Sequence, residues 1–555
     1  MRNSHDICVG GDGVCASESL IGSALAVAPL EITSAIDTNE ELRKFKMGDG
    51  WAQLEEPLKS RPVRQSVATP YVRAHSRQVS HPLSRPRAET REPGTYASGS
   101  RSSGLRRTLG IGFSEAKKAL EGPLIRNAAS LYGSTIITSF FGFFYWFIAA
   151  RLVSAQAVGI ASAVQSSAQF ISIFCVLGLS TFVISELSID KVQARSLILT
   201  AAVGVGVLTI VVSIGVGVIL QHSSSAISEG VAGSVGILVF VVLGTLSTVL
   251  LVLDDACIGL LRGDLQLRRN AVFAISKLAI LPILVLAWAR QSGIELVVAW
   301  TAGLAISTFV LLFELGRLTK GQSSRIDLRN IFYKRRLMFR HHWLNLSIQS
   351  PRLIFPVLVA LIISPGANAA FTATLLIVGI IQTIPNLLST VLFALAPGDE
   401  AALRREVRKT MRISLVLSLA SAPCFFIFSG FILRLFGPNY AMASAAMGFL
   451  GLSTYPYALK SHYVAIARVQ GKMQQAVLVT LAGAALEVAF AALGGALHGL
   501  TGVSIGILVA LSLEAVIYLP TVLGVIRPSR RRRRKSRGAR EIRGKTAKGG
   551  QPGRI

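Results

Sequence analysis

The chain has 555 residues, of which 51% are hydrophobic and only 15% are charged. Together with a mean hydropathy of +0.55, this composition excludes an ordinary soluble fold. The net charge of +28 does not indicate a nucleic-acid-binding protein, because thirteen of the Lys and Arg residues lie in the last segment, 527–555.

The first 122 residues predict a disordered N-terminal tail. The stretch from Pro57 to Arg107 is rich in Ser, Pro and Arg and has little apolar periodicity. An apolar run at Leu20–Leu30 begins too late for a signal peptide, lacks a basic region before it, and is followed by acidic residues. We therefore do not interpret it as a targeting segment.

Twelve long apolar stretches follow this tail. A hydrocarbon core takes about 20 apolar residues as helix, and each stretch supplies that length. We place the spans at residues 128–150, 158–184, 196–220, 234–261, 270–289, 294–316, 343–364, 369–397, 413–436, 441–467, 475–497 and 501–526. The fold class predicted is an all-α polytopic membrane protein.

The positive charges between the spans predict its orientation. Twenty Lys and Arg residues, Arg268 and Arg269 among them, lie in the gaps after even-numbered spans. The gaps after odd-numbered spans hold only Arg151 and Arg290, and Arg434 lies at the end of the ninth span. By the positive-inside rule, the even-numbered gaps and both termini face the cytoplasm.

The spans divide into two groups of six at the longest internal gap. This predicts an N-lobe at 123–316, a cytoplasmic loop at 317–342, a C-lobe at 343–526 and a basic cytoplasmic tail at 527–555. The lobes also share short words: Leu246-Ser247-Thr248 of the fourth span recurs 206 residues later as Leu452-Ser453-Thr454 of the tenth. An even number of spans per half is typical of a parallel repeat, with a cavity between the lobes.

This architecture favours a secondary transporter over an enzyme. The gaps predicted to lie outside the cell hold only about 4 to 13 residues, too few for the external loop of a glycan polymerase or ligase. No Gly-x-x-x-x-Gly-Lys-[Ser/Thr] loop is present, so the chain carries no ATPase motif of its own. Between the second and third spans, Glu186–Arg195 lacks the Gly-x-x-x-Asp-Arg turn expected of a major-facilitator transporter.

Several short sequence motifs carry a family resemblance. They are Ala149–Val153 at the end of the first span, Leu433–Tyr440 before the tenth, Tyr463–Arg468 at its end, and Leu500–Gly506 at the start of the twelfth. In these motifs the chain resembles bacterial polysaccharide-transport flippases of the multidrug/oligosaccharidyl-lipid/polysaccharide exporter superfamily. The motifs lie at helix ends and turns, so they identify a fold more specifically than a substrate.

The resemblance implies two six-helix lobes that turn over a polyprenyl-diphosphate-linked oligosaccharide in the bacterial cytoplasmic (inner) membrane, with both termini inside. It implies a polar, cationic cavity, no cofactor, coupling to a Na⁺ or H⁺ gradient, and other polysaccharide-assembly membrane proteins as partners. Multidrug exporters share this fold, and a cation-coupled exporter of that kind is the alternative function. Cavity charge separates the two, because cationic drugs favour acids and a lipid diphosphate favours bases.

Arg352 is the candidate anchor for a diphosphate. It lies nine residues into the seventh span between Pro351 and Pro356, and nine residues of helix span about 13 Å. A guanidinium can bind phosphate oxygens in bidentate fashion. The alternatives are a structural pair with a buried acid, or a side chain that reaches back to the membrane surface.

Other charges inside the spans are further candidates. Lys460 and Lys277 are candidate substrate-binding cations, and the 206-residue offset aligns Lys460 with Asp254. Because Asp254 and Asp255 are acidic, a salt bridge from them to Lys460 could act as a gate between the lobes; reach to the membrane surface is the simpler alternative.

Glu487 and Glu514, near the middle of the last two spans, are candidates for ion coupling or for structural pairing with Lys460 or Arg352. Tyr145, Trp146 and Trp343 lie at span ends and are predicted to be interfacial anchors.

The C-terminal segment 527–555 predicts an interaction with lipid. Its run from Arg530 to Lys535 immediately follows the last span on the predicted cytoplasmic side. Such runs fix orientation and attract anionic head groups. Binding to RNA or to an acidic protein is the alternative, although no nucleic-acid partner is expected.

Overall fold

The computed structural model describes residues 123–189, 191–222, 226–287, 292–326, 335–390, 392 and 400–527. Within these ranges the chain forms helices and connecting turns, without a strand. The predicted disordered tail, 1–122, and the predicted basic tail, 527–555, lie outside them, apart from Arg527.

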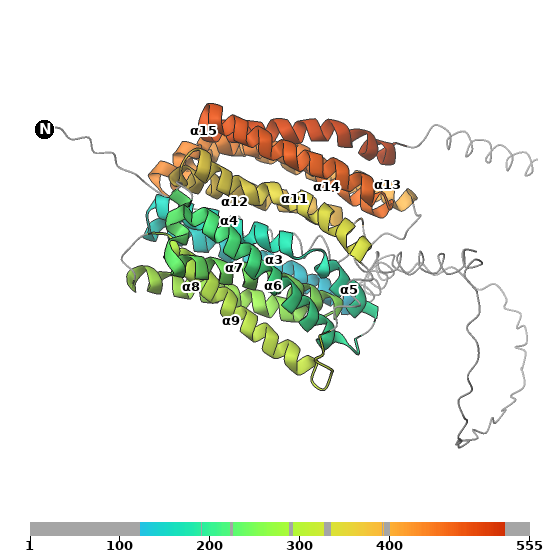
Figure 1. Cartoon of the computed structure of the whole chain (residues 1–555). Coiled ribbons are helices and arrows are strands. Elements are labelled where there is room, and N and C mark those ends of the chain that lie inside the picture. The colour runs from blue at the N-terminus through green and yellow to red at the C-terminus, as the bar shows by residue number, and fades with distance from the viewer. Residues whose placement is uncertain are drawn as a thin grey trace, which may run out of the picture. The chain divides into compact units, whose positions relative to one another are not determined.

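Long helices account for most of the described chain (Figure 1). In chain order, the helices are α3 (Pro123–Leu152), α4 (Ala155–Cys175), α5 (Leu179–Ile189), α6 (Ala194–His222), η1 (Ala226–Val231), α7 (Gly233–Gly259), α8 (Gly263–Ala287), α9 (Ile294–Leu318), α11 (Arg335–Ile362), α12 (Pro365–Thr390), α13 (Glu400–Arg434), η3 (Pro438–Ala443), α14 (Ser444–Val469) and α15 (Met473–Ile526).

The helices confirm the prediction of an all-helical, multi-pass membrane protein. Ten of the described helices are long and apolar enough to cross a membrane. Eleven of the twelve predicted spans fall on these ten helices, and the tenth falls on α14, which is not among the ten. The division of the spans differs from the prediction in two places. The second span is divided between α4 and α5, and the last two spans lie in α15, which is interrupted at Gly499 (φ 58°, ψ −143°).

Two helices begin earlier than predicted. α11 begins at Arg335 rather than at 343, and α13 begins at Glu400 rather than at 413. The early turns of α13 are amphipathic: Leu403, Val407 and Met411 are buried in a cluster with residues of α11 and α15. Polar gap residues therefore extend these helices beyond the apolar spans, and the loop predicted at 317–342 is helical in its last part.

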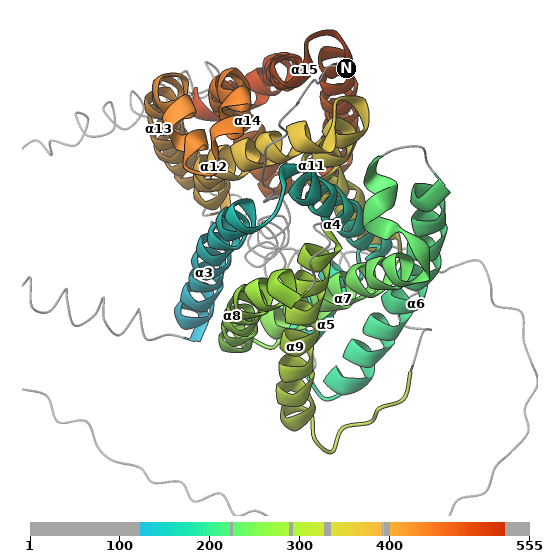
Figure 2. The ribbon, with the colours of Figure 1, turned by 90° about the vertical axis from the view of Figure 1, so that its left-hand side faces the viewer.

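The helices pack in two groups. Helices α3 to α9, here called the N-half, pack mainly against one another, as do helices α11 to α15, the C-half. Figure 2 shows the two groups, with α4 of the N-half next to α11 and α12 of the C-half. Helix α4 is therefore the main contact between the halves, and most of its residues are buried.

Small residues allow α4 to approach the C-half closely at both of its ends. A Cβ atom on Gly159 would lie 1.8 Å from the carbonyl oxygen of Pro365. At the same end Asn368 of α12 donates hydrogen bonds to the Gly159 carbonyl and the Ser162 hydroxyl, each 2.8 Å long. At the other end, Gly178 (φ 79°) follows α4 and lies against the backbone of Met338.

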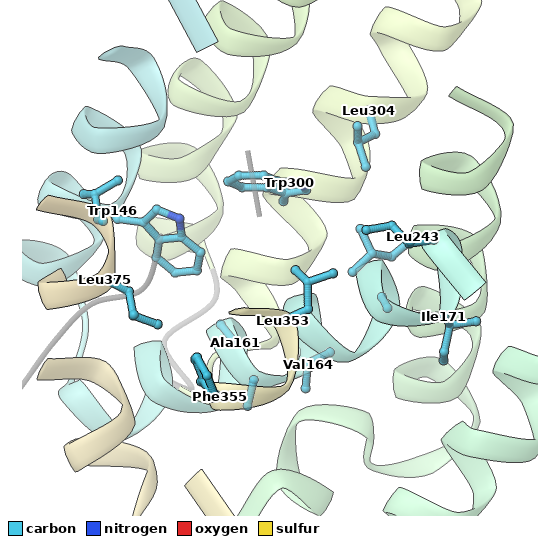
Figure 3. Close-up of a cluster of buried hydrophobic side chains, with 14 of the residues drawn as sticks. Trp146, Ala161, Val164, Ile171, Leu243, Trp300, Leu304, Leu353, Phe355 and Leu375 are labelled. Carbon is cyan, nitrogen blue, oxygen red and sulfur yellow. The ribbon is translucent and has the colours of Figure 1, made fainter. Parts of the chain in front are cut away.

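Apolar side chains fill the space between these two contacts. Figure 3 shows Leu353 and Phe355 of α11 in one buried cluster with Ala161 and Val164 of α4. The cluster continues into the N-half as far as Trp300 of α9. The two halves thus share an apolar core along α4.

Candidate functional site

A cavity of about 160 Å³ lies on the C-half side of the molecule. Helices α11, α12, α14 and α15 form most of its wall, and Thr135 and Ser139 of α3 complete it. Along α14 the lining runs from Leu450 to Arg468, a distance of about 27 Å at the helical rise of 1.5 Å per residue. The cavity therefore extends along most of α14, toward the end that the charge pattern predicts to be cytoplasmic.

Aromatic contacts close the opposite end of the molecule. Phe143 and Phe147 of α3 meet Phe436 of the C-half with ring centroids 5.4 and 5.3 Å apart, and Phe436 stacks on Tyr440. The guanidinium of Arg151 donates to the Leu435 carbonyl. Together with the Gly159–Pro365 contact, these residues join the two halves at the end away from the Arg468 side of the cavity.

Arg352 lines the cavity from α11. Its side chain is half-buried, and its Nη2 atom donates to the carbonyl of Leu375 on α12 over 3.3 Å. Pro351, which precedes it, also lines the cavity. Arg352 thus lies on the cavity wall, and its role as a diphosphate anchor stays a prediction.

The cavity contains a second arginine and a set of amides that the sequence analysis did not single out. Arg468 donates to the side-chain oxygen of Asn345 over 2.8 Å. Asn386 donates to the Tyr457 hydroxyl over 2.7 Å and accepts from the Ser461 hydroxyl. Gln349 and Gln382 add further amide groups to the wall. The sequence places Arg468 at the end of a span that contains several polar residues, but we interpreted it only as one of the charges that predict orientation.

Lys460 is the centre of a buried charged cluster. Its ammonium forms an ion pair with Glu487 and a second one, 3.0 Å long, with Glu514. The Tyr518 hydroxyl donates to Glu514 over 2.6 Å. Of the two structural alternatives for the glutamates, pairing with Lys460 is the one observed. Lys460 and Glu487 line the cavity, whereas Glu514 lies behind them, against Gly483.

The N-half carries its own buried ion pair, between Arg269 of α8 and Asp254 of α7. The next residue, Asp255, is also buried and bonds the side chain of Ser180. Among the described contacts, the predicted salt bridge from Asp254 or Asp255 to Lys460 is absent, because each charge takes a partner within its own half. Arg269 was missed as a partner since we placed it in a gap rather than in a helix.

Lys277 does not line the cavity, which corrects its predicted position in a substrate site. Its side chain is fully buried in the N-half, with Nζ 3.9, 4.5 and 5.3 Å from the ring centroids of Trp300, Phe273 and Tyr145. Tyr145 and Trp146 are also buried, so the prediction that they are interfacial anchors is wrong. Trp343 is 40% exposed, as an anchor would be.

Comparison with known proteins identifies the fold. No family model matches the sequence, and no curated protein matches it. Among solved structures, the chain is similar to an inward-facing multidrug resistance MATE family transporter of the MOP superfamily, with a TM-score of 0.53 and 16% identity over 68% of this chain and 92% of that one.

An outward-facing transporter of the same description gives a TM-score of 0.50 at 14% identity, covering 73% of this chain and 96% of that one. A MATE structure in a bent conformation gives 0.50 at 13% identity, over 73% and 95%. The fold is that of a MATE family transporter. The predicted all-helical transporter fold is therefore confirmed, and the structures named here are described as transporters.

Proposed function

We propose that this protein is a membrane transporter that flips a polyprenyl-diphosphate-linked oligosaccharide across the bacterial cytoplasmic membrane, for the assembly of a cell-surface polysaccharide. The transporter fold supports transport as the general activity. The observation that carries the substrate class is the pair of arginines, Arg352 and Arg468, on the wall of the cavity.

The charge of the cavity favours an anionic substrate. Among the described lining residues, the cations are Arg352, Lys460 and Arg468, and Glu487 is the one acid. The charge of Lys460 is offset by its two glutamates, so the excess positive charge of the wall comes from the arginines. A guanidinium binds phosphate oxygens through a planar fork of N–H donors, which suits a diphosphate.

The remaining polar groups suit a sugar. Asn345, Gln349, Gln382 and Asn386 offer both donors and acceptors to hydroxyl groups, and Tyr457 offers an aromatic ring with a hydroxyl. In this proposal the diphosphate lies at the arginines, the sugar lies against the amides, and the lipid tail stays in the bilayer.

The buried cluster of Lys460, Glu487 and Glu514 supports coupling to a cation gradient. One ammonium beside two ionised carboxylates leaves a net charge of −1 in a buried site, which one proton or one Na⁺ would neutralise. Glu514 Oε1 has no hydrogen-bond partner among the described residues, so an acceptor is available there. We propose that the coupling ion binds at this cluster, next to the cavity.

The substrate proposal is tested at Arg352. In a strain that lacks the native gene, Arg352→Ala should abolish glycan export while the amount of inserted protein stays normal, and Arg352→Lys should keep part of the activity because the charge remains without the fork. Arg317→Ala, which changes an exposed arginine of α9, is the matched control. Full export by Arg352→Ala would overturn the proposal. Extrusion of cationic dyes that is driven by a proton gradient, without glycan export, would favour the multidrug alternative.

The proposed location and orientation are tested separately. Reporter fusions after Ser154 and Gly366 should report outside the cytoplasm, and fusions after Arg325 and Pro528 should report inside. Removal of the basic segment after Pro528 should weaken association with vesicles of anionic lipid by about 1 kcal/mol per lost surface charge, without loss of glycan export. An inside report after Ser154 would contradict the predicted topology.

A further inference from the structure

Lys277 occupies a closed compartment inside the N-half. Its side chain has no exposed surface. Phe273 of its own helix α8, Tyr145 of α3 and Trp300 of α9 surround the ammonium nitrogen with aromatic faces. A Cβ atom on Gly303 would lie 3.0 Å from the Lys277 Cβ, so the backbone of α9 covers the stem of the side chain.

The compartment offers Lys277 no hydrogen-bond acceptor. Within the described residues, its Nζ atom has no partner, and no carboxylate lies within ion-pair distance. This sets Lys277 apart from Lys460, whose ammonium contacts two carboxylates. A buried ammonium ion without a counter-ion is strongly disfavoured, and such a group gives up its proton instead.

Among the described residues, no titratable or charged group around Lys277 contacts its Nζ atom. From α3, the Tyr145 hydroxyl donates to the Leu296 carbonyl over 2.7 Å. From α9, Glu295 accepts from the Ser292 hydroxyl over 3.3 Å through Oε2, while its buried Oε1 has no hydrogen-bond partner among the described residues. From α7, Asp254 pairs with Arg269. None of these groups contacts Lys277 Nζ, so the amine has only π faces around it.

We propose that Lys277 is a proton-binding site of the N-half, a neutral amine in the closed arrangement that takes up one proton when α3 and α9 separate enough to admit water. The proton comes from water and bonds to the Nζ lone pair, and no other bond changes. The indole face of Trp300 is already 3.9 Å from Nζ in the closed arrangement, but a cation–π interaction does not offset the loss of hydration until water is admitted. This site is distinct from the cluster at Lys460, and only the use of its proton for transport rests on the proposed function.

The protonation state of Lys277 can be measured directly. In the full-length protein with ¹⁵N-labelled lysine, reconstituted in nanodiscs at pH 7, we expect one lysine side-chain resonance at the position of a neutral amine. That resonance should be missing in Lys277→Met, which keeps the length of the side chain, and should remain in Lys320→Met, which changes an exposed lysine. If only ammonium resonances are present and one of them is lost in Lys277→Met, the proposal is wrong.

Uptake of the proton has an optical readout, since Trp300 lies against the amine. As the pH is lowered, tryptophan emission of the same sample should change reversibly, and the change should be lost in both Lys277→Met and Trp300→Phe. It should persist in Trp343→Phe, which removes a partly exposed indole. A change that persists in Lys277→Met would overturn the proposal. Neither measurement uses an oligosaccharide, so failure of the flippase proposal would leave both results unaffected.

Discussion

The two halves of the molecule hold similar buried charges in different arrangements. In both, a basic and two acidic side chains lie where two consecutive long helices meet: α7 and α8 in the N-half, and α14 and α15 in the C-half. In the N-half Arg269 contacts Asp254, while Asp255 turns to Ser180. In the C-half Lys460 contacts both glutamates.

This difference indicates that the function of a buried charge depends on how many counter-ions surround it. A pair that is complete, such as Arg269 with Asp254, has nothing left to bind and holds two helices together. A cluster with one carboxylate in excess can accept a cation, and a lysine with none can accept a proton. The same residue types therefore give a structural contact in one place and a candidate ion site in another, according to how the partners are shared.

The largest effect should come from breaking the complete pair. Arg269→Met should destabilise the protein by about 3–5 kcal/mol, because Asp254 is left buried without its cation. Thermal unfolding of the purified protein would measure this. Arg268→Met, at a neighbouring side chain that is 62% exposed, is the control and should have little effect. If the double variant Arg269→Met with Asp254→Asn is no more stable than Arg269→Met alone, the unpaired Asp254 is not the cause of the lost stability.

A smaller effect is expected from a single change in the C-half cluster. Glu487→Gln should cost about 1 kcal/mol, because Lys460 keeps its 3.0 Å contact with Glu514 and the amide still accepts a hydrogen bond. Glu487→Gln combined with Glu514→Gln should cost about 3–5 kcal/mol, since Lys460 then has no counter-ion. Thermal unfolding of the two single variants and of the double variant completes a double-mutant cycle. Additive costs would show that the two glutamates do not share the lysine.

A similarly small effect should come from Tyr518→Phe. This change removes the hydroxyl that donates to Glu514 and keeps the ring that stacks on Tyr463 at 4.3 Å, so we expect a loss of about 1 kcal/mol. If the cluster binds Na⁺, unfolding temperatures should rise when NaCl replaces KCl at constant ionic strength. The rise should be smaller in Tyr518→Phe than in the parent protein, and absent in Glu514→Gln. A rise that Glu514→Gln retains would place the ion elsewhere.

The sequence predicted the helices well because hydrophobic length alone decides whether a segment spans a bilayer. Even the division between the last two spans, expected between 497 and 501, coincides with the kink at His498 and Gly499. The early starts of α11 and α13 were missed because their first turns are polar and amphipathic, so hydropathy does not detect them. The break after α4 depends on the left-handed backbone of Leu177 and Gly178, which packing against Met338 selects.

The candidate site was predictable only in part. Position along a span identified Arg352 and Glu487, and both line the cavity. Which helix face a charge occupies was not predictable, because it depends on contacts between helices far apart in sequence. Lys277 was therefore placed in the cavity when it lies in an aromatic compartment, and Tyr145 was placed at an interface when it forms part of that compartment.

The composition of α14 has a consequence for how the protein is made. Its length would suffice to cross a membrane, yet it is not among the ten described helices that are also apolar enough to do so. Lys460 lies within it, and the carboxylates that offset this charge are synthesised later, in α15. We therefore expect α14 to enter lipid less readily alone than the ten apolar helices do. Glu487 of α15 should favour its insertion once that helix is made, because the carboxylate then offsets the charge of Lys460.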